Sequence, residues 1–347
     1  MNKQINFSIV IPHRNIPKLL QRCLNSIPRR EDIQIIVVDD NSDPSIVDFE
    51  QFPCINDPFV EIIFSKEGKG AGHVRNVGLT RAVGKWLLFA DADDFFCYCL
   101  NDAFNEYLNS DVDIIYFKHN CIDSDTYITR ERCENYNTFI NFWLQNSRKA
   151  DVLLRYRHAS VWAKFIKMEF VNKNKIMFDV VSIANDVTFA YLIGFHAISI
   201  HADPRALYCT TIRKNSIRHQ NKSAQMKLDN FYVGCKRHHF FTNNNIPISC
   251  DISHVRSLIN FYFYDRYYFD MAKNILFKLG FTSSKILILC LRYLLLYKLK
   301  KHIVRLSYFP RKIALKYFPD DGFLSVLHLK LKKQQSKNFL NNRKHEE

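Results

Sequence analysis

Two aspartates separated by one residue, Asp91 and Asp93, follow a short apolar run at residues 86–90. Carboxylate oxygens in this spacing suit a hard divalent cation, Mg²⁺ or Mn²⁺. Such a cation typically takes one or two protein ligands and completes its coordination with phosphate oxygens and water. A cation held in this way neutralises a diphosphate and stabilises it as a leaving group. The pair therefore predicts a divalent-metal site that handles a diphosphate.

A second acidic pair, Asp39 and Asp40, ends the apolar run at residues 33–38. Either carboxylate could accept hydrogen bonds from a nucleobase N–H or a ribose hydroxyl. Arg75 stands near the start of an expected helix at residues 72–83, where a guanidinium could approach a base edge or a phosphate. Together these groups have the chemistry to bind a nucleoside diphosphate.

Apolar runs of strand length alternate with segments of helical spacing over the first 120 residues. The expected strands are 7–11, 33–38, 60–64, 86–90 and 112–117, and the expected helices are 18–27 and 72–83. Near-continuous apolar strands between amphipathic helices predict an α/β fold with a mostly parallel sheet and helices on both faces. Ligands of such sheets bind beyond the carboxyl ends of the strands.

Three of these strands end in polar clusters: Pro12-His13-Arg14-Asn15, Asp39-Asp40 and Asp91-Ala92-Asp93. Any one cluster could be an ordinary turn or a helix cap. Because all three are expected at one edge of one sheet, a shared binding site explains them better.

The later sequence has a mixed pattern followed by a helical one. Helices are expected at 162–172 and 186–193, and strands at 197–200 and 207–212. After about residue 222 the chain is expected to be helical and increasingly basic.

The net charge of +15 is concentrated near the C-terminus. Residues 281–347 contain 15 Lys or Arg against 4 Asp or Glu, which leaves a near-neutral body and argues against nucleic-acid binding. The basic region has two explanations. It is a set of solvated helices packed on the body, or an interfacial anchor over 281–330 that contacts anionic lipid.

The expected location is the cytoplasm. The ten cysteines are scattered without a C-x-x-C pair, which predicts reduced thiols and no zinc site. The N-terminus leads directly into a strand without a signal-peptide pattern. The apolar stretch at 286–297 is shorter than the ~20 residues that a membrane span needs.

The ordered set of motifs resembles glycosyltransferase family 2, whose members have the GT-A fold. The resemblance covers about residues 5–220. It is carried by Ser8–Asn15, Ile35–Ser42, the Arg-Asn-x-Gly-Leu segment within Gly70–Leu79, the Asp-x-Asp at the end of Ala82–Asp94, Trp162–Asp179, Asn185–Asp186 and Tyr208–Ile217. It implies an inverting glycosyltransferase that takes a sugar from a nucleotide-diphospho-sugar.

The resemblance also implies a role for individual residues. On the donor side, Asp40 recognises the base with Asp39 beside it, Arg75 contacts the base, and Pro12 and Asn15 form the first turn. Asp91 meets the ribose or metal-bound water, and Asp93 binds the metal. Asp186 is the general base, while Arg213 and Ser216 close over the diphosphate or acceptor. Asp91 also counts as a second metal residue.

Two positions depart from the family pattern. Arg14 replaces the aromatic residue of the first turn, which leaves uracil expected but not secured as the base. Asn185 replaces the acidic residue before Asp186, and Asp186 could instead be an ordinary carboxylate at a helix N-terminus. His219 could be an additional metal ligand, but a lone surface histidine is the preferred explanation.

The sequence thus predicts a GT-A domain at 1–220 and a helical, basic region at 221–347. Residues 1–120 form the nucleotide-sugar half and 121–220 the acceptor half. The expected activity is metal-assisted (Mn or Mg) transfer from a UDP-sugar to a glycan or lipid-linked saccharide in surface polysaccharide biosynthesis, on the inner face of the cell membrane. The alternatives are an inactive membrane-peripheral binding protein and a sugar nucleotidyltransferase. The latter would need a glycine-rich first loop, yet the first glycine is Gly68.

Overall fold

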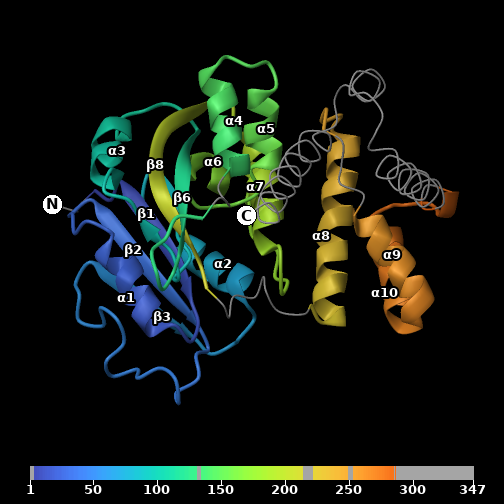
Figure 1. The fold of residues 1–347 in the computed structure, drawn as a ribbon, viewed down its shortest axis with the longest axis horizontal. Helices are drawn as coiled ribbons and strands as arrows, with labels where there is room; N and C mark the ends of the chain where they lie inside the picture. Colours follow the sequence, from blue (N-terminus) through green and yellow to red (C-terminus); the bar gives the residue numbers. More distant parts are fainter. Residues whose placement is uncertain (1–3, 131–133, 214–221, 249–252, 285, 287–347) are drawn as a thin grey trace, which may run out of the picture.

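The structure is a computed structural model that describes residues 4–130, 134–213, 222–248, 253–284 and 286 (Figure 1). The strands are β1 (Phe7–His13), β2 (Ile33–Asp40), β3 (Val60–Ser65), β4 (Trp86–Phe89), β5 (Phe95–Phe96), β6 (Ile114–Asp123), β7 (Lys164–Lys167) and β8 (Ile200–Ile212). The helices are α1 (Pro17–Asn25), α2 (Ala71–Arg81), α3 (Leu100–Tyr107), α4 (Glu134–Leu144), α5 (Ala150–Arg157), α6 (Met168–Lys173), α7 (Asn185–His196), α8 (Ala224–Asn243), α9 (Ser253–Tyr264) and α10 (Arg266–Lys278).

The strands form one sheet in the order β3-β2-β1-β4-β7-β6-β8-β5. Strands β1 to β4 are mutually parallel, and β8 is parallel to β6. The short β7 is antiparallel to both of its neighbours, and β5 is antiparallel to β8. The mostly parallel sheet that the apolar runs predicted is therefore confirmed.

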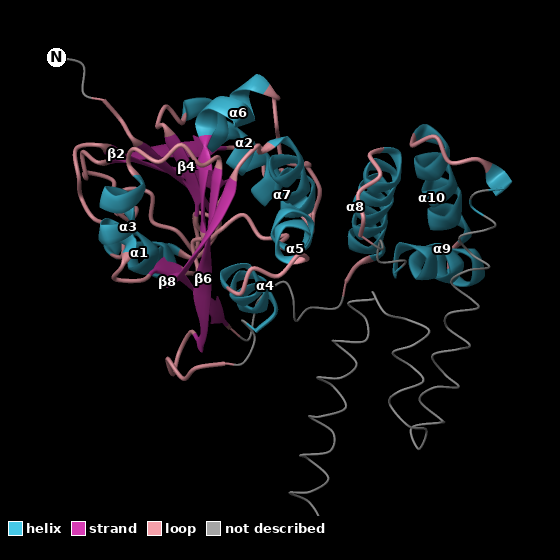
Figure 2. Cartoon of the chain, turned by 90° about the horizontal axis from the view of Figure 1, so that it is seen from above, coloured by secondary structure: helices cyan, strands magenta, loops and turns pink. Residues whose placement is uncertain are grey.

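Helices cover both faces of the sheet, with α1 and α3 on one side and α2 and α4 to α7 on the other (Figure 2). Side chains alternate between two cores because successive strand residues point to opposite faces. In β1, Ile9 and Ile11 pack with α1 and α3, whereas Val10 packs against α2. Buried positions on both faces explain why these strands have continuous apolar sequences.

The prediction of a helix at residues 162–172 is wrong for the first half of that range. Ala163 has a positive φ of 55°, which ends any helix there, and the chain then forms β7 before α6 begins at Met168. Phe165 packs into one core and Ile166 into the other, so a strand buries both side chains where one helical face would not. A short apolar run does not distinguish these two states by its period.

The two strands expected at 197–200 and 207–212 are a single strand, β8. The register between β6 and β8 shifts around Lys118, so an irregularity accommodates the polar residues between the two expected pieces. The remaining predicted strands and helices of the first 120 residues correspond to observed elements.

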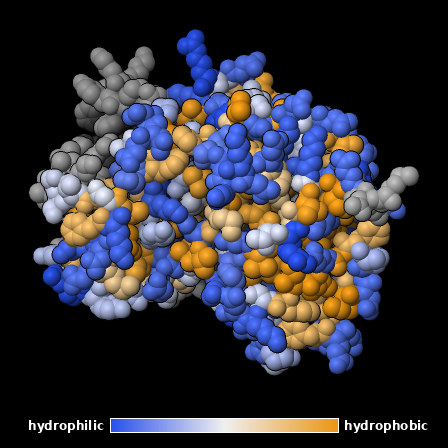
Figure 3. Space-filling view, turned by 180° about the vertical axis from the view of Figure 1, so that it is seen from behind, coloured by the Kyte–Doolittle hydropathy of each residue, from blue (hydrophilic) through white to orange (hydrophobic). Residues whose placement is uncertain are grey.

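The described part of the C-terminal region is helical, as predicted. Helices α8, α9 and α10 enclose their own small core, which includes Leu228, Phe231, Cys235, Leu258, Phe261, Ala272, Leu276 and Phe281. Apolar and hydrophilic side chains are interspersed over the face shown in Figure 3. Among the described residues, none of the helices combines the length and apolar character that crossing a bilayer requires.

Most of the predicted membrane-contact segment, 281–330, lies outside the described residues, as do Ser216 and His219. The predicted domain boundary at 220 also falls on residues that the structure leaves undescribed. The boundary therefore stays a prediction.

Helix α2 approaches β1 closely at Gly78, and this contact generates a test. A Cβ on Gly78 would lie 2.4 Å from Val10 Cγ1. In an exposed helix, a Gly→Ala change raises the free energy of unfolding by about 1 kcal/mol. At Gly78 we expect the same change to lower it by about 1–3 kcal/mol, because the added methyl group overpacks the contact. Urea unfolding measures this, and the cost should shrink in a Val10→Ala background. If Gly78→Ala lowers the free energy of unfolding equally in the wild type and in Val10→Ala, the contact with Val10 is contradicted.

Candidate active site

The carboxyl ends of β1, β2 and β4 bring the three polar clusters to one edge of the sheet. His13 at the end of β1 lies opposite Asp39 in β2, and the Ala90 N–H after β4 donates to Val10 O in β1. The convergence expected from the strand pattern is present. The site is therefore assembled from segments separated by 26 to about 80 residues in the chain.

Three carboxylates crowd together after β4. One oxygen each from Asp91, Asp93 and Asp94 lies within 4.8 Å of the others. Burial raises the pKa of Asp93 and the charge of Asp91 raises it further, against the lowering effect of Arg213. Burial and the charges of Asp93 and Asp91 raise the pKa of Asp94 well above its ordinary value. Crowded, partly buried carboxylate oxygens fit a hard divalent cation, because its charge would relieve this repulsion.

The third carboxylate, Asp94, is used internally. Its Oδ1 accepts a hydrogen bond from the Thr211 N–H at 2.6 Å, and the Tyr208 hydroxyl is a further partner. The same Tyr208 hydroxyl accepts the Asp91 N–H at 2.8 Å. Strand β8 thus holds the Asp-x-Asp turn in place, a role that the sequence did not indicate for Asp94 or Tyr208.

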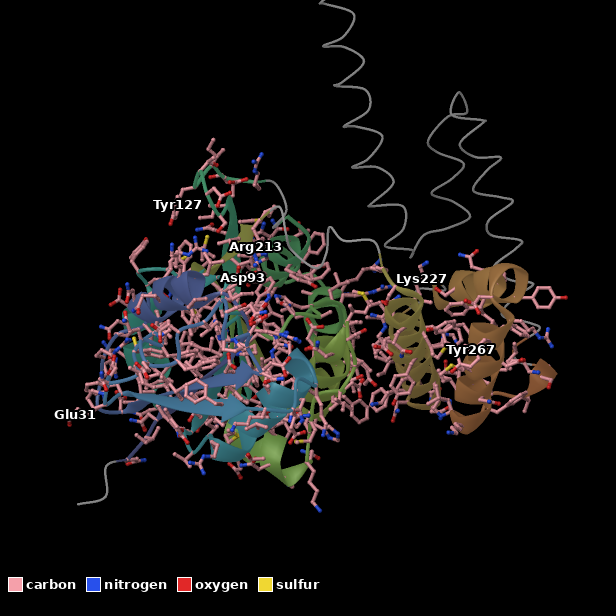
Figure 4. The ribbon with its side chains drawn as sticks, turned by 90° about the horizontal axis from the view of Figure 1, so that it is seen from below. Glu31, Asp93, Tyr127, Arg213, Lys227 and Tyr267 are labelled. Carbon is pink, nitrogen blue, oxygen red and sulfur yellow. The ribbon has the colours of Figure 1, made fainter. Side chains whose placement is uncertain are left out.

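Two arginines contact Asp93. Arg213 Nε donates to Asp93 Oδ2 at 2.9 Å, and the two side chains lie side by side (Figure 4). Arg22 from α1 donates through Nη2 to the Asp93 carbonyl at 2.6 Å and through Nη1 to Ser124. Arg22 is a site residue that sequence reasoning missed, since a single arginine within an amphipathic helix carries no signal.

Arg75 links the acidic cluster to the start of α7. Its Nη2 donates to Asp91 Oδ1 at 2.5 Å, and its Nη1 donates to Asn185 Oδ1 at 2.6 Å. Arg75 is buried, and its guanidinium lies 5.5 Å from the Phe178 ring centroid. Asn185, which replaces the acidic residue of the family pattern, therefore contributes a neutral amide that accepts a hydrogen bond from Arg75.

Asp39 is engaged by neighbours on both carboxylate oxygens. Oδ1 lies 2.7 Å from His13 Nδ1 and accepts the Ser42 hydroxyl, while Oδ2 accepts the Ser42 N–H. Because His13 Nε2 accepts the Ile16 N–H at 3.2 Å, the ring proton resides on Nδ1 and donates to Asp39. Burial raises the pKa of Asp39, but these hydrogen bonds outweigh it and hold the pKa below its ordinary value. Asp39 therefore fixes the turn, and its direct contact with a donor stays a prediction.

Asp40 and the first turn lie next to this group. Asp40 accepts the Gly70 N–H at the start of α2, and Arg14 lies 3.7 Å from its Oδ2. Burial raises the pKa of Asp40. The Asn15 side-chain oxygen accepts the Asp43 N–H at 2.8 Å, and the Asn15 backbone N–H donates to the Ser42 hydroxyl. Pro12, in β1, lies opposite Val38 of β2. The predicted donor residues of the first two strands thus form one connected turn structure.

Asp186 lies in the first turn of α7, directly after Asn185. Ala184 precedes the helix with a φ of 58°, which turns the chain into it. Burial lowers the pKa of Lys164, and the charge of Asp186 opposes that effect, so the two groups interact electrostatically. The predicted base therefore directly follows Asn185, the residue that Arg75 holds.

Residues 8–165 match the model of the family described as Glycosyl transferase family 2. This segment of the chain is therefore similar to family 2 glycosyltransferases. The PGL/p-HBAD biosynthesis glycosyltransferase of Mycobacterium bovis is 36% identical over 90 residues, covering 25% of this chain and 35% of the relative. The poly(ribitol-phosphate) beta-glucosyltransferase of Bacillus spizizenii is 35% identical over 96 residues, covering 26% of this chain and 15% of the relative.

Among solved structures, S. aureus TarS 1-349 in complex with UDP-GlcNAc matches with a TM-score of 0.53 at 21% identity. The match covers 76% of this chain and 74% of that one. This likeness shows the fold, which is of the GT-A type as the motifs predicted. The chain spans about a third of the length of the curated relatives matched first, with 35% covered.

The family match includes the donor-side residues but ends at β7. Asp39, Asp40, Arg75, Asp91 and Asp93 lie within it. The candidate base, Arg213 and the C-terminal helices lie beyond it. The structure adds what the family match does not cover, because it joins Asn185, next to the candidate base, to Arg75 and joins Arg213 to Asp93.

The environment of Lys164 generates a pH test. Its Nζ donates to the carbonyls of His158 and Ser160, and burial lowers its pKa from 10.5 to about 7, against the charge of Asp186. Between these pH values the folded chain releases a proton that the unfolded chain keeps, so this lysine makes the free energy of unfolding rise with pH. Urea unfolding at pH 7 and pH 9.5 should show a smaller rise for Lys164→Met than for the wild type. Identical pH slopes would contradict the assignment.

Proposed function

We propose that this chain transfers a sugar from a nucleotide-diphospho-sugar, a UDP-sugar, to an acceptor hydroxyl with inversion at the anomeric carbon. The observation that carries the proposal is the carboxylate cluster of Asp91 and Asp93 at the sheet edge, next to the Asp39–Asp40 turn and to Arg75. The match of residues 8–165 to the family model supports it. So does the UDP-GlcNAc complex of the similar TarS structure.

The donor would lie across the carboxyl ends of β1, β2 and β4. Asp40 accepts a base N–H, and Arg75 contacts the base while it keeps Asp91 in place. Asp91 meets the ribose or metal-bound water. Pro12 and Asn15 form the turn beneath the nucleoside. Asn15 already belongs to the first-turn structure, Asp40 binds the start of α2, and Arg75 binds Asp91.

Asp93, with Asp91 beside it, would hold the divalent metal, Mn or Mg. When bound, the metal neutralises the negative charge of the diphosphate leaving group. Arg213 pairs with Asp93 in the structure and would turn to the diphosphate when the donor binds. Ser216, which lies outside the described residues, is also predicted to contact the diphosphate or the acceptor. Arg213 would then supply a fixed positive charge to the leaving group.

Asp186 would be the general base. It accepts the proton of the acceptor hydroxyl as that oxygen forms a bond to the anomeric carbon. The bond between the anomeric carbon and the diphosphate oxygen breaks with its electron pair, and the nucleoside diphosphate leaves. A single displacement of this kind inverts the anomeric centre.

The acceptor would be a glycan or a lipid-linked saccharide in surface polysaccharide biosynthesis. The poly(ribitol-phosphate) beta-glucosyltransferase among the relatives supports this class. A lipid-linked acceptor would require the protein to act in the cytoplasm, peripherally on the inner face of the membrane. The basic segment 281–330 has the charge to contact anionic lipid there.

Asp93→Asn tests the metal site because it keeps the side-chain size and removes the charge. We expect the variant to fold but to lose the Mn²⁺-dependent rise in melting temperature that UDP gives the wild type, since a ligand of the folded state raises its stability. Differential scanning fluorimetry measures this. Asp111→Asn, at an exposed carboxylate outside the site, is the matched control and should keep the rise. An unchanged rise in Asp93→Asn would exclude Asp93 as a ligand.

Asp186→Asn tests the base. We expect kcat to fall by about 10²–10⁴-fold because proton transfer is lost, while the thermal shift given by Mn²⁺ and UDP stays as in the wild type. Release of UDP from a UDP-sugar in the presence of acceptor measures turnover. Normal turnover in Asp186→Asn would falsify the base assignment. Loss of the UDP-induced shift would instead identify Asp186 as a structural carboxylate of α7.

A further inference from the structure

Helix α2 holds one side of residues 178–186, the segment that leads to the candidate base, through hydrogen bonds and a close backbone contact. The Asn76 side chain donates to Phe178 O at 3.0 Å and accepts the Phe178 N–H at 2.8 Å. Arg75 donates to Asn185 at 2.6 Å. Gly72 lies so near that an added Cβ would be 2.1 Å from the Asp179 carbonyl oxygen. Helix α2 therefore fixes both ends of the segment against the donor side.

Helix α8 holds the same segment from the other side. Lys236 Nζ donates to Asp179 Oδ1 at 2.6 Å, and Thr188 in α7 donates to Asp179 Oδ2 at 2.5 Å. Asp229 Oδ2 accepts both the N–H and the hydroxyl of Ser182, at 2.8 and 2.5 Å. The Asp179 carboxylate thus joins α8 to the first turn of α7, two residues beyond Asp186.

Helix α8 is itself anchored on two faces. Phe240 and Phe241 pack on aromatic rings of α5 and α7, with ring centroids of Phe240 and Tyr191 4.9 Å apart. Asp229, Lys236 and Phe240 recur at spacings of seven and four residues, so they share one helical face. Leu228 and Phe231 face the core shared with α9 and α10. In both ribbon views α8 lies between α7 and these last helices (Figures 1 and 2).

We propose that α8 positions the general base, with Lys236 and Asp229 as positioning residues that act on Asp186 through Asp179 and Ser182. The inference rests on the proposed function of Asp186. The Asp179 side chain is 11% exposed and Lys236 is 31% exposed, so this ion pair is only partly screened by water. A displacement of about 1 Å at a reacting group can cost on the order of 10²-fold in rate. The C-terminal helical region is then a working part of the active site.

The first experiment compares Lys236→Met, Lys236→Arg and Arg266→Met in the full-length chain. Lys236→Met should lower kcat by about 10–100-fold and leave the donor KM within twofold, because the donor side is held by α2. Lys236→Arg should restore most of kcat, since a guanidinium can also donate to Asp179. Arg266→Met, which removes an exposed ion pair within α10, is the control and should leave kcat unchanged. Wild-type kcat in Lys236→Met would overturn the proposal.

The second experiment needs no turnover, so it separates this inference from the proposed function. Amide hydrogen exchange should become faster at residues 178–188 in Lys236→Met and in Asp229→Asn, while α10 keeps its wild-type exchange. If the wild-type chain has no transferase activity but exchange at residues 178–188 is faster in the variants, the proposed function is refuted. The inference that α8 holds this segment is then still supported. Unchanged exchange at 178–188, or an equal increase throughout the chain, would overturn the positioning role.

Discussion

The site depends on crowding of negative charge at one end of β4. Asp91, Asp93 and Asp94 follow a buried strand, and burial and mutual repulsion raise the pKa values of the latter two. Each is offset by a partner from another part of the chain. Arg75 reaches Asp91, Arg213 reaches Asp93, and the β8 backbone at Thr211 binds Asp94. Helix α2 and strand β8 must therefore lie where they do for the three carboxylates to remain together.

The candidate base depends on a different kind of constraint. Residues 178–186 have little regular structure, so their position is set by side chains of the helices on either side. Asn76 and Arg75 contribute from α2, and Lys236 and Asp229 from α8. A segment held by polar contacts rather than by a sheet can be tuned without changing the core. This arrangement joins the donor half of the domain to the C-terminal helices.

Much of the fold could be predicted because parallel strands buried on both faces leave continuous apolar runs. The predicted strands at 7–11, 33–38 and 86–90 correspond to β1, β2 and β4, and their polar ends do share one edge. The failure at 162–172 has a local cause. Ala163 adopts a left-handed conformation that its sequence context does not announce, and Phe165 and Ile166 then serve two different cores.

The sequence by itself indicated the family resemblance, the sheet and the candidate chemistry of Asp91, Asp93 and Asp186, because motif order and strand period are local properties of the chain. The tertiary structure alone decided which side chains hold the segments that carry these residues. Arg22, Tyr208 and Lys236 reach their partners across 71, 117 and 57 residues. No spacing rule encodes such contacts, since they arise only when the strands and helices have packed.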